Sequence, residues 1–495
     1  MEYDVVVVGG GSAGLAAAIS AAENGASTFL MEKNRELGGT SGWSVGSITS
    51  SATAHQRAMD IYDSPDHHYE DMGLFHAQHL VERDNLVLRR LLVDNVPETV
   101  DWLVNFGLVF YGPMPEPPHT QPRMHNILPN SRMLIHQLSK QARKVGVEIR
   151  TSYPLSELFV ENGKVKGVKS GEEHILSRNG VILAAGDFSA NAELKNKYMP
   201  PNVAKIDGFN PDSTGDWHDL VIPLGGRVLN GDIALGPEIR FQPPVNHSFV
   251  RSLPPWLWLA RFVRWSINHV PSRILRPFIL GFLTTALMPS LALYERGALL
   301  INKEGNRFSD ELDNPSDEMS NQPDGQAYII IDSTVARVFQ KWPNFVSTAP
   351  GIAYAYLDDY RRNRPDIYFE AQSLEALAEK INMDPLKLKN SISEYNGHEA
   401  NEKRLPCIKP PFIALGPVQS YIMTTDGGLA VDEHLQVLDQ NDLPIPGLFA
   451  AGSTGQGGLL LEGHGHHLGW SFTSGRLAGR YAALAARDDE ELITT

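Results

Sequence analysis

The hydrophobic and polar pattern of the first thirty-odd residues predicts a strand, a helix and a second strand. Residues 5–8 are four consecutive valines, a β-branched run typical of a strand buried on both faces of a parallel sheet. The alanine-rich stretch 15–24 predicts a helix ending near Gly25, and residues 27–31 predict the next strand. Gly9, Gly11 and Gly14 form a G-x-G-x-x-G turn between the first strand and the helix. The chain therefore opens with a predicted β-α-β unit.

This turn and the residues after it have the chemistry of a dinucleotide site. Glycines around Ser12 and Ala13 let a pyrophosphate approach backbone N–H groups at the helix N-terminus. Glu32, at the end of the second strand and before Lys33, can accept both ribose hydroxyls of an adenosine. A second loop of small residues is placed to wrap the far end of a long cofactor; its members are Gly38, Gly39, Thr40, Ser41, Ser44, Val45 and Gly46.

Hydrophobic spacing further along the chain predicts a mixture of helices and strands. Residues 51–107 read as helices that Pro97 should interrupt, and the proline-rich residues 111–132 should be irregular. Residues 131–145 predict a helix, and residues 148–150 and 180–186 predict strands. The Asn162-Gly163 pair predicts a hairpin between two of the strands.

Composition excludes several function classes. With 495 residues and 42% apolar content, the chain is long enough for two or three domains with a large core. A net charge of −15 argues against general nucleic-acid binding. Cys407 is the only cysteine, which excludes disulfides within one chain and favours a reducing compartment. Because Glu2 and Asp4 stand where a signal peptide would be basic, a cytoplasmic location is expected.

Several segments resemble one flavoprotein family. Residues 33–47, 294–311, 444–452 and 463–479 are similar to motifs of the family that contains fumarate reductase, succinate dehydrogenase, L-aspartate oxidase and the 3-ketosteroid dehydrogenases. The resemblance implies an α/β fold with a Rossmann-type, glutathione reductase-like FAD-binding domain and an inserted α+β cap. The expected FAD-binding parts are residues 1–240 and 421–495, and the expected cap is residues 241–420.

The resemblance also implies further FAD contacts. The expected positions are Pro154 and Leu155 at the adenine, Ala184, Ala185 and Gly186 on a returning strand, Asp216 in a Thr-Gly-Asp turn, Gly452 and Ser453 after the last strand, and His467 and Leu468 at a helix start. That helix would direct its dipole at the reduced flavin. Thr40 stands where covalent members carry a histidine, so FAD should bind without a covalent link. No second dinucleotide fingerprint is found, so the electrons should leave the flavin for the substrate itself or for an external acceptor, such as a quinone.

The family's substrate ligands are mostly replaced. The positions at which fumarate reductases hold a dicarboxylate carry Thr424, Pro315 and Glu462 here. The two tyrosine positions of ketosteroid dehydrogenases carry Pro315 and Leu461. The resemblance therefore favours α,β-dehydrogenation of an apolar cyclic ketone, such as a 3-ketosteroid or a cyclohexanone derivative, or the reverse enone reduction.

Candidate groups for proton transfer or carbonyl polarisation are Tyr294, Tyr111, His464 and His466. A metal is the rival interpretation for the histidines at 464, 466 and 467. No carboxylate or cysteine set accompanies them at ligand spacing, so no metal site is predicted. His119, Arg123 and His125 either belong to a family-like Arg-x-His element or only bind loop backbone.

The segment 253–294 is rich in tryptophan, arginine and apolar residues. It suits either peripheral membrane contact or a pair of core helices in the cap. Pro277, Gly281 and Pro289 argue against a membrane-spanning helix. Two other functions stay open: a reductase or oxidase of an organic acid that uses Arg123 and Arg296 as anion clamps, and a non-catalytic FAD-fold protein that binds lipid or a partner.

Overall fold

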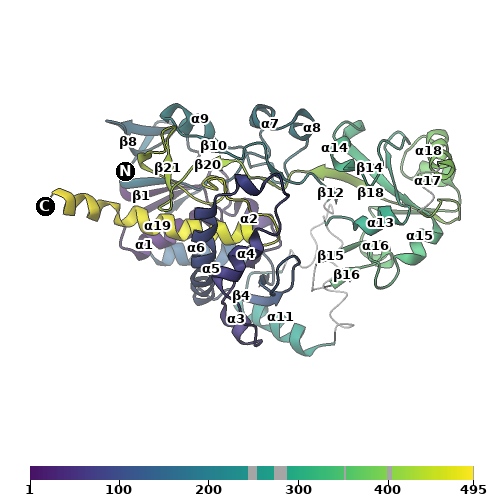
Figure 1. Ribbon diagram of the computed structural model, residues 1–495, viewed down its shortest axis with the longest axis horizontal. Coiled ribbons are helices and arrows are strands. Elements are labelled where there is room, and N and C mark those ends of the chain that lie inside the picture. Colours follow the sequence, from purple (N-terminus) through teal and green to yellow (C-terminus); the bar gives the residue numbers. More distant parts are fainter. Residues whose placement is uncertain (243–252, 272–286, 350–352, 399–403, 494–495) are drawn as a thin grey trace.

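The computed structural model describes residues 1–242, 253–271, 287–349, 353–398 and 404–493. Figure 1 shows two parts, which we name the body and the cap. The body is formed by residues 1–235, 253–271 and 424–493, and the cap by residues 238–242, 287–349, 353–398 and 404–421. Two neighbouring antiparallel strands, β12 (Glu238–Phe241) and β18 (Phe412–Tyr421), lead from the body into the cap.

The body is built on an eight-stranded sheet that contains the predicted N-terminal unit. Its main path has the order β21-β22-β9-β1-β2-β6, with β8 on β9 and β7 on β8. The bounds are β1 Glu2–Val8, β2 Thr28–Met31, β6 Glu148–Arg150, β7 Glu157–Glu161, β8 Lys164–Ser170, β9 Glu173–Leu183, β21 Gln436–Leu438 and β22 Pro444–Ala450. Strands β22, β9, β1, β2 and β6 are mutually parallel. The four valines of β1 are buried, as their pattern predicted.

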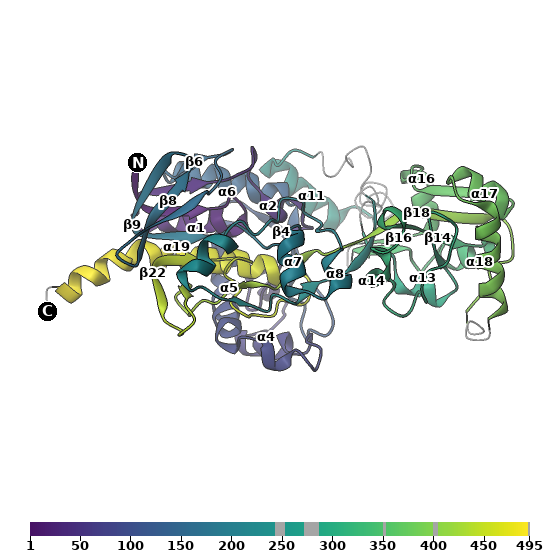
Figure 2. The same cartoon turned by 90° about the horizontal axis from the view of Figure 1, so that it is seen from above.

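Long helices pack beside this sheet. Helix α1 (Ser12–Glu23) lies along α19 (His466–Ile493), and α5 (Leu86–Asn105) and α6 (Arg132–Lys144) pack against these two (Figures 1 and 2). The prediction that Pro97 interrupts the helix is wrong, because α5 continues through it. Leu92, Val96, Val100 and Leu103 are buried on both sides of the proline. Burial of such side chains contributes about 1.5–3 kcal/mol each, which outweighs the cost of one proline.

The expected irregular loop at 111–132 is partly strand. Strands β4 (Val109–Met114) and β5 (Met124–Leu128) pair with each other, and β5 also pairs with β3 (Ser47–Thr49). The prolines fall mostly between these strands, so the ladder of backbone hydrogen bonds loses few N–H donors.

Further body elements are α2 Gly39–Trp43, α3 Ala54–Arg57, α4 Pro65–Met72, α7 Ala192–Tyr198, α8 Pro201–Ala204, α9 His218–Val221, β10 Val228–Leu229, β11 Ala234–Leu235, β19 Thr424–Thr425 and β20 Gly428–Leu429.

The cap has its own sheet and its own two clusters of buried apolar side chains. Its sheet has the order β12-β18-β14-β13, and β17 also pairs with β18. The remaining bounds are β13 Leu299–Asn302, β14 Gln326–Ile331, β15 Ser347–Ala349, β16 Ala353–Ala355, β17 Tyr368–Ala371, α13 Leu291–Glu295, α14 Pro315–Met319, α15 Ser333–Val338, α16 Leu357–Asn363, α17 Leu374–Lys380 and α18 Pro385–Gly397. The predicted domain limits near 240 and 420 stay a prediction.

The described parts of the segment 253–294 are residues 253–271, which form helix α11 (Leu257–His269), and residues 287–294, which lead into α13. Helix α11 packs against β4 and β5 of the body and is not a core helix of the cap, whereas Leu293 and Tyr294 of α13 are buried in the cap core. Much of the apolar run that starts at Pro277 lies outside the described residues. Among the helices that the structure describes, none is long and apolar enough to cross a membrane.

Candidate active site

A cavity of about 450 Å³ lies at the carboxyl ends of the parallel strands. Parallel α/β sheets bind ligands at this edge. Val8 at the end of β1, Met31 at the end of β2 and Ala451 after β22 line it. Most of the predicted cofactor residues also line it: Gly9, Gly11, Ser12, Ala13, Glu32, Lys33, Gly39, Thr40, Ser41, Ser44, Val45, Gly46, Leu155, Ala184, Ala185, Gly186, Asp216, Gly452, Ser453, His467 and Leu468.

Three predicted cofactor residues do not line the cavity. Gly14 lies in the first turn of α1, where a Cβ would come within 1.8 Å of the Gly9 carbonyl oxygen. Gly38 precedes α2 and its N–H donates to the Gly10 carbonyl at 2.9 Å. Pro154 is the neighbour of Leu155, which does line the wall. Gly14 and Gly38 therefore shape the backbone around the cavity, and direct contact with a cofactor is not supported for them.

The geometry at Glu32 fits an adenosine. Glu32 is held by backbone N–H donors, from Gly10 to Oε2 at 2.6 Å and from Asn34 to Oε1 at 2.8 Å. Tyr153 and Leu155 line the wall near this end. An ideal Cβ on Gly11 would have one neighbour, the Gly38 carbonyl oxygen at 3.8 Å, so the space over this turn is open. Open space over the turn, a positioned carboxylate and a helix N-terminus are what a dinucleotide requires.

A histidine and a carboxylate meet at the other end of the cavity. The backbone N–H of His464 donates to Oε1 of Glu116 at 2.8 Å, and the His464 Nδ1 lies 2.5 Å from the same oxygen. The His464 side chain is 65% exposed, whereas that of Glu116 is 10% exposed. The hydrogen bond to Glu116 raises the pKa of His464 above its ordinary value. This pair can hold or release a proton at the imidazole, into the cavity.

Apolar and paired charged side chains complete this end. Glu238 and Arg240 of β12 form an ion pair at 2.6 Å. The Arg240 guanidinium lies 5.6 Å from the ring centre of Phe209, which is in turn 6.3 Å from Trp43. Leu235, Leu287 and Met423 also line the wall. Sequence patterns missed Glu116, Glu238 and Arg240, because none of them belongs to a local motif.

The other predicted proton-transfer groups lie elsewhere. Tyr294 is buried in the cap core, where burial raises the pKa of its hydroxyl, and it does not line the cavity. Tyr111 lies on β4 and is half-buried beside the body core. His466 is 1% exposed, and burial lowers its pKa to about 3. Of the four predicted groups, His464 is the one that lines the cavity.

Three buried histidines, His68, His119 and His466, lie close enough to share a ligand. His68 Nε2 is 3.3 Å from His466 Nε2. Arg123 Nη1 donates to His119 Nδ1 at 2.9 Å, which places the His119 proton on Nε2. That nitrogen then has no lone pair for a cation, and the guanidinium beside it repels one. The arrangement therefore does not favour a metal site.

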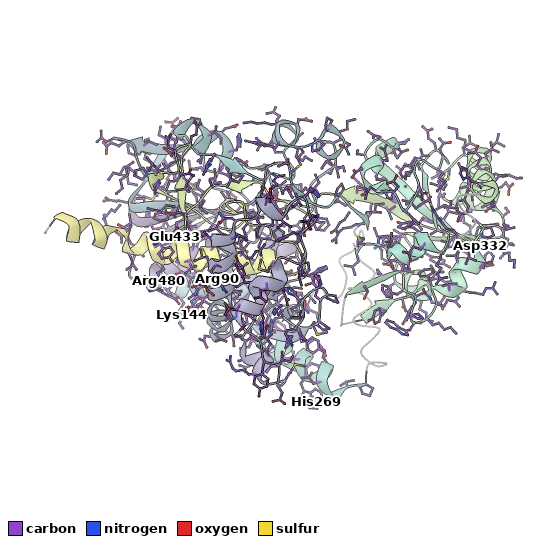
Figure 3. All side chains as sticks on the ribbon, viewed as in Figure 1. Arg90, Lys144, His269, Asp332, Glu433 and Arg480 are labelled. Carbon is purple, nitrogen blue, oxygen red and sulfur yellow. The ribbon has the colours of Figure 1, made fainter. Side chains whose placement is uncertain are left out.

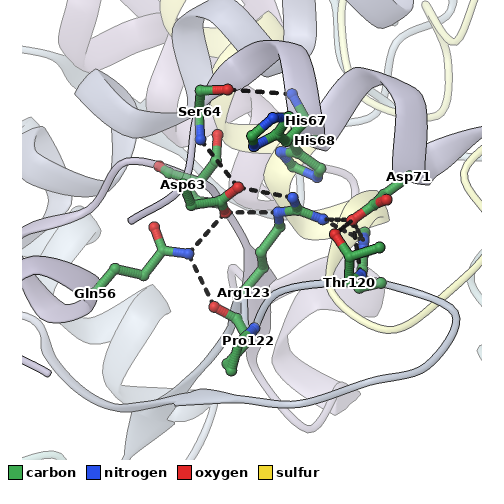
Figure 4. Close-up of polar contacts among 12 residues, drawn as sticks. Gln56, Asp63, Ser64, His67, His68, Asp71, Thr120, Pro122 and Arg123 are labelled. Atoms are coloured by element: carbon green, nitrogen blue, oxygen red, sulfur yellow. Dashed lines mark hydrogen bonds and ion pairs between the residues drawn. The ribbon is translucent and has the colours of Figure 1, made fainter. Parts of the chain in front are cut away.

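Arg123 is an internal structural residue in this arrangement (Figure 4). Its side chain is fully buried, and it binds Asp63 through Nε and Nη2 at 2.7 Å and also pairs with Asp71. His125 is buried too and bonds Thr53 at 3.0 Å. Arg296 is exposed and does not line the cavity. The anion clamp of Arg123 and Arg296 is therefore not assembled at this cavity.

Arg123→Met should destabilise the protein by about 3–5 kcal/mol, because it leaves two buried carboxylates without their cation. The free energy of unfolding in urea measures this. Arg83→Met is the matched control, since Arg83 pairs with Asp232 at the surface and its loss should cost about 0–1 kcal/mol. Equal effects of the two substitutions would contradict the structural role of Arg123.

The fold and the cavity define a dinucleotide-binding flavoprotein. The FAD binding domain family matches residues 4–243 and 273–460, so the chain belongs to this family. Family membership confirms the predicted FAD-binding fold and the prediction of an FAD-dependent oxidoreductase.

Two curated relatives are similar to this chain over nearly its whole length. NADH:fumarate oxidoreductase of Klebsiella pneumoniae (strain 342) is 26% identical over 98% of this chain, which spans 48% of that protein. Vinyl phenol reductase of Lactiplantibacillus plantarum is 27% identical, with coverage of 97% of this chain and 96% of the relative.

Solved structures share the fold. The open conformation of a flavocytochrome c3 fumarate reductase superposes with a TM-score of 0.74 at 24% identity, over 98% of this chain and 78% of that one. The 3-ketosteroid delta1-dehydrogenase from Sterolibacterium denitrificans has a TM-score of 0.66 at 19% identity, over 97% and 99% of the two chains. Both branches that the sequence motifs resemble are thus neighbours in fold.

Proposed function

We propose that the protein interconverts a carbon–carbon single bond and a conjugated double bond in a neutral, largely apolar substrate, such as a cyclic ketone and its enone. The main support for this proposal is the charge of the residues that line the cavity. Around His464 the charged residues of the wall are Glu116, Glu238 and Arg240, and Arg240 is paired with Glu238 at 2.6 Å. A dicarboxylate would meet repulsion without an unpaired cation.

The proposed chemistry divides between the cofactor and the protein. When bound, FAD supplies hydride transfer at the carbon β to the carbonyl, in either direction. His464 exchanges the α proton, and Glu116 stabilises the imidazolium form. Trp43, Phe209 and Met423 keep the surrounding wall apolar. This lowers the local dielectric and strengthens the interaction within the histidine–carboxylate pair.

The protein is also proposed to bind FAD without a covalent link. Thr40 occupies the expected attachment position, and its hydroxyl accepts a hydrogen bond from Asn210 Nδ2 at 2.9 Å and lies 3.2 Å from Ser213 Oγ. A threonine hydroxyl so engaged is a poor attachment point. An acid-precipitated protein should therefore release all of its FAD into the supernatant.

We further propose that the electrons pass to or from an external partner such as a quinone, in the cytoplasm. Vinyl phenol reductase, a relative of nearly equal length, supports a neutral substrate because its name describes a phenol. The fumarate-related relatives support the alternative of an organic acid. Substrate tests must decide between them.

Anaerobic flavin spectra test the proposed function. Cyclohexanones or 3-ketosteroids should bleach the flavin absorbance, and the matching enones should restore it after reduction. Succinate and fumarate, which test the rival, should do neither. Responses to dicarboxylates alone would overturn the proposal, and no response to any small molecule would favour the non-catalytic alternative.

A further inference from the structure

Helix α11 exposes a row of aromatic side chains. Trp256, just before the helix, is 52% exposed, and Trp258, Phe262 and Trp265 within it are 62%, 55% and 52% exposed. They stack in two pairs, Trp256 on Trp258 with ring centres 5.6 Å apart and Phe262 on Trp265 at 6.0 Å. Isolated exposed apolar residues are ordinary, but three large ones on one helix and a fourth just before it mark an interaction surface.

The opposite face of α11 anchors it to the body. Ala260 is fully buried, and Leu257, Val263 and Ile267 pack against the body core. The helix lies on β4 and β5, so its orientation is fixed by contacts that leave the aromatic face outward. Figure 3 shows His269, at its C-terminal end, at the lower edge of the molecule. The aromatic face is therefore presented to the surroundings by a rigid support.

The charge of residues 253–271 is opposite in sign to that of the whole chain. Arg261 and Arg264 are exposed on α11. The sequence from 253 to 271 contains no acidic residue, although the whole chain has a net charge of −15. A local positive charge on an acidic protein directs this one face toward an anionic surface.

We propose that α11 binds the surface of an anionic phospholipid bilayer. Tryptophan is favoured at the bilayer interface, where its ring is buried and its N–H stays near the headgroups. Arginine can extend to lipid phosphates while its methylene groups cover apolar surface. The helix would lie in the interface plane, which needs no spanning segment. This proposal is independent of the proposed reaction.

A second copy of the chain fits this face less well. In a two-fold dimer, α11 would face α11, and Arg261 and Arg264 would meet their own copies. The helix carries no carboxylate to neutralise them. Each chain also has a net charge of −15, so association is opposed at long range as well.

Flotation of the FAD-loaded full chain with vesicles tests the proposal. The protein should float with vesicles of phosphatidylcholine and phosphatidylglycerol, much less with phosphatidylcholine alone, and less at high salt. Trp258→Ser/Trp265→Ser and Arg261→Gln/Arg264→Gln should each lower the partition coefficient about tenfold or more. None of these residues lines the cavity, so FAD content should stay unchanged.

Matched controls come from the cap. Trp342 is 60% exposed, and Arg361 and Arg362 are exposed on α16. Trp342→Ser and Arg361→Gln/Arg362→Gln should leave flotation unchanged. Failure of the parent protein to float with anionic vesicles would overturn the proposal. So would equal losses in the controls, or a dimer in solution that Trp258→Ser/Trp265→Ser converts to a monomer.

Discussion

Replacing His464 by alanine is expected to lower kcat by about 10²–10⁴-fold, the usual range for loss of a general acid or base. The imidazole is exposed to the cavity and paired with Glu116, so it is the proposed proton carrier. FAD content should not change, because the Glu32 end of the cavity is untouched. Steady-state kinetics with an enone, together with the flavin spectrum, measures both quantities.

The pH profile separates proton transfer from a merely structural role. In enone reduction the imidazolium donates, so kcat should be constant at low pH and fall as pH rises through the raised pKa of His464. In desaturation the neutral imidazole accepts, so the dependence reverses. Glu116→Gln can still accept the backbone N–H of His464 but removes the charge, so the fall should move to lower pH.

His434→Ala is the matched control, because His434 is exposed on the surface and does not line the cavity. It should retain the parent rate and profile. The proposed role of His464 would be rejected if His464→Ala kept its rate, or if Glu116→Gln left the profile in place.

The cofactor end of the site could be predicted because it is encoded locally. Residues 9–14 and Glu32 belong to one β-α-β unit, so their spacing along the chain fixes their spacing in space. The other end is assembled from distant segments. Glu116 and His464 are 348 residues apart in sequence. The proline-rich stretch that contains Glu116 is recognisable as unusual, but no local sequence pattern indicates that Glu116 contacts His464.

The neighbouring histidines show a second limit of prediction from the sequence. His464, His466 and His467 are almost consecutive, yet His464 and His467 line the cavity and His466 is buried against His68. Gly463 and Gly465 have φ values of +85° and +93°, so the chain direction changes just before α19 begins. A regular period cannot be applied across such a turn. The buried position of Tyr294 could not be predicted either, because tyrosines occur in hydrophobic cores as well as in active sites.

The second large effect concerns substitutions of two glycines of the same turn. One substitution should weaken FAD binding, and the other should prevent folding. Gly11→Val should reduce FAD affinity at least about 100-fold while the apoprotein still folds. The side chain would enter open space over the turn, where the pyrophosphate must approach the backbone. Gly14→Val should prevent folding, because even a Cβ would lie 1.8 Å from the Gly9 carbonyl oxygen and force α1 away from β1.

Equilibrium titration of apoprotein with FAD and thermal unfolding without FAD distinguish the two cases. The Gly11 variant should unfold near the parent apoprotein temperature and gain little stability from added FAD, whereas the parent should gain it by mass action. Gly25→Ala provides a control outside the cavity, since a Cβ there meets nothing within 4 Å, although its φ of +91° makes some loss of stability expected. If Gly11→Val bound FAD as tightly as the control, the pyrophosphate would have to lie elsewhere, because the space that this side chain fills would not be the space that the cofactor needs.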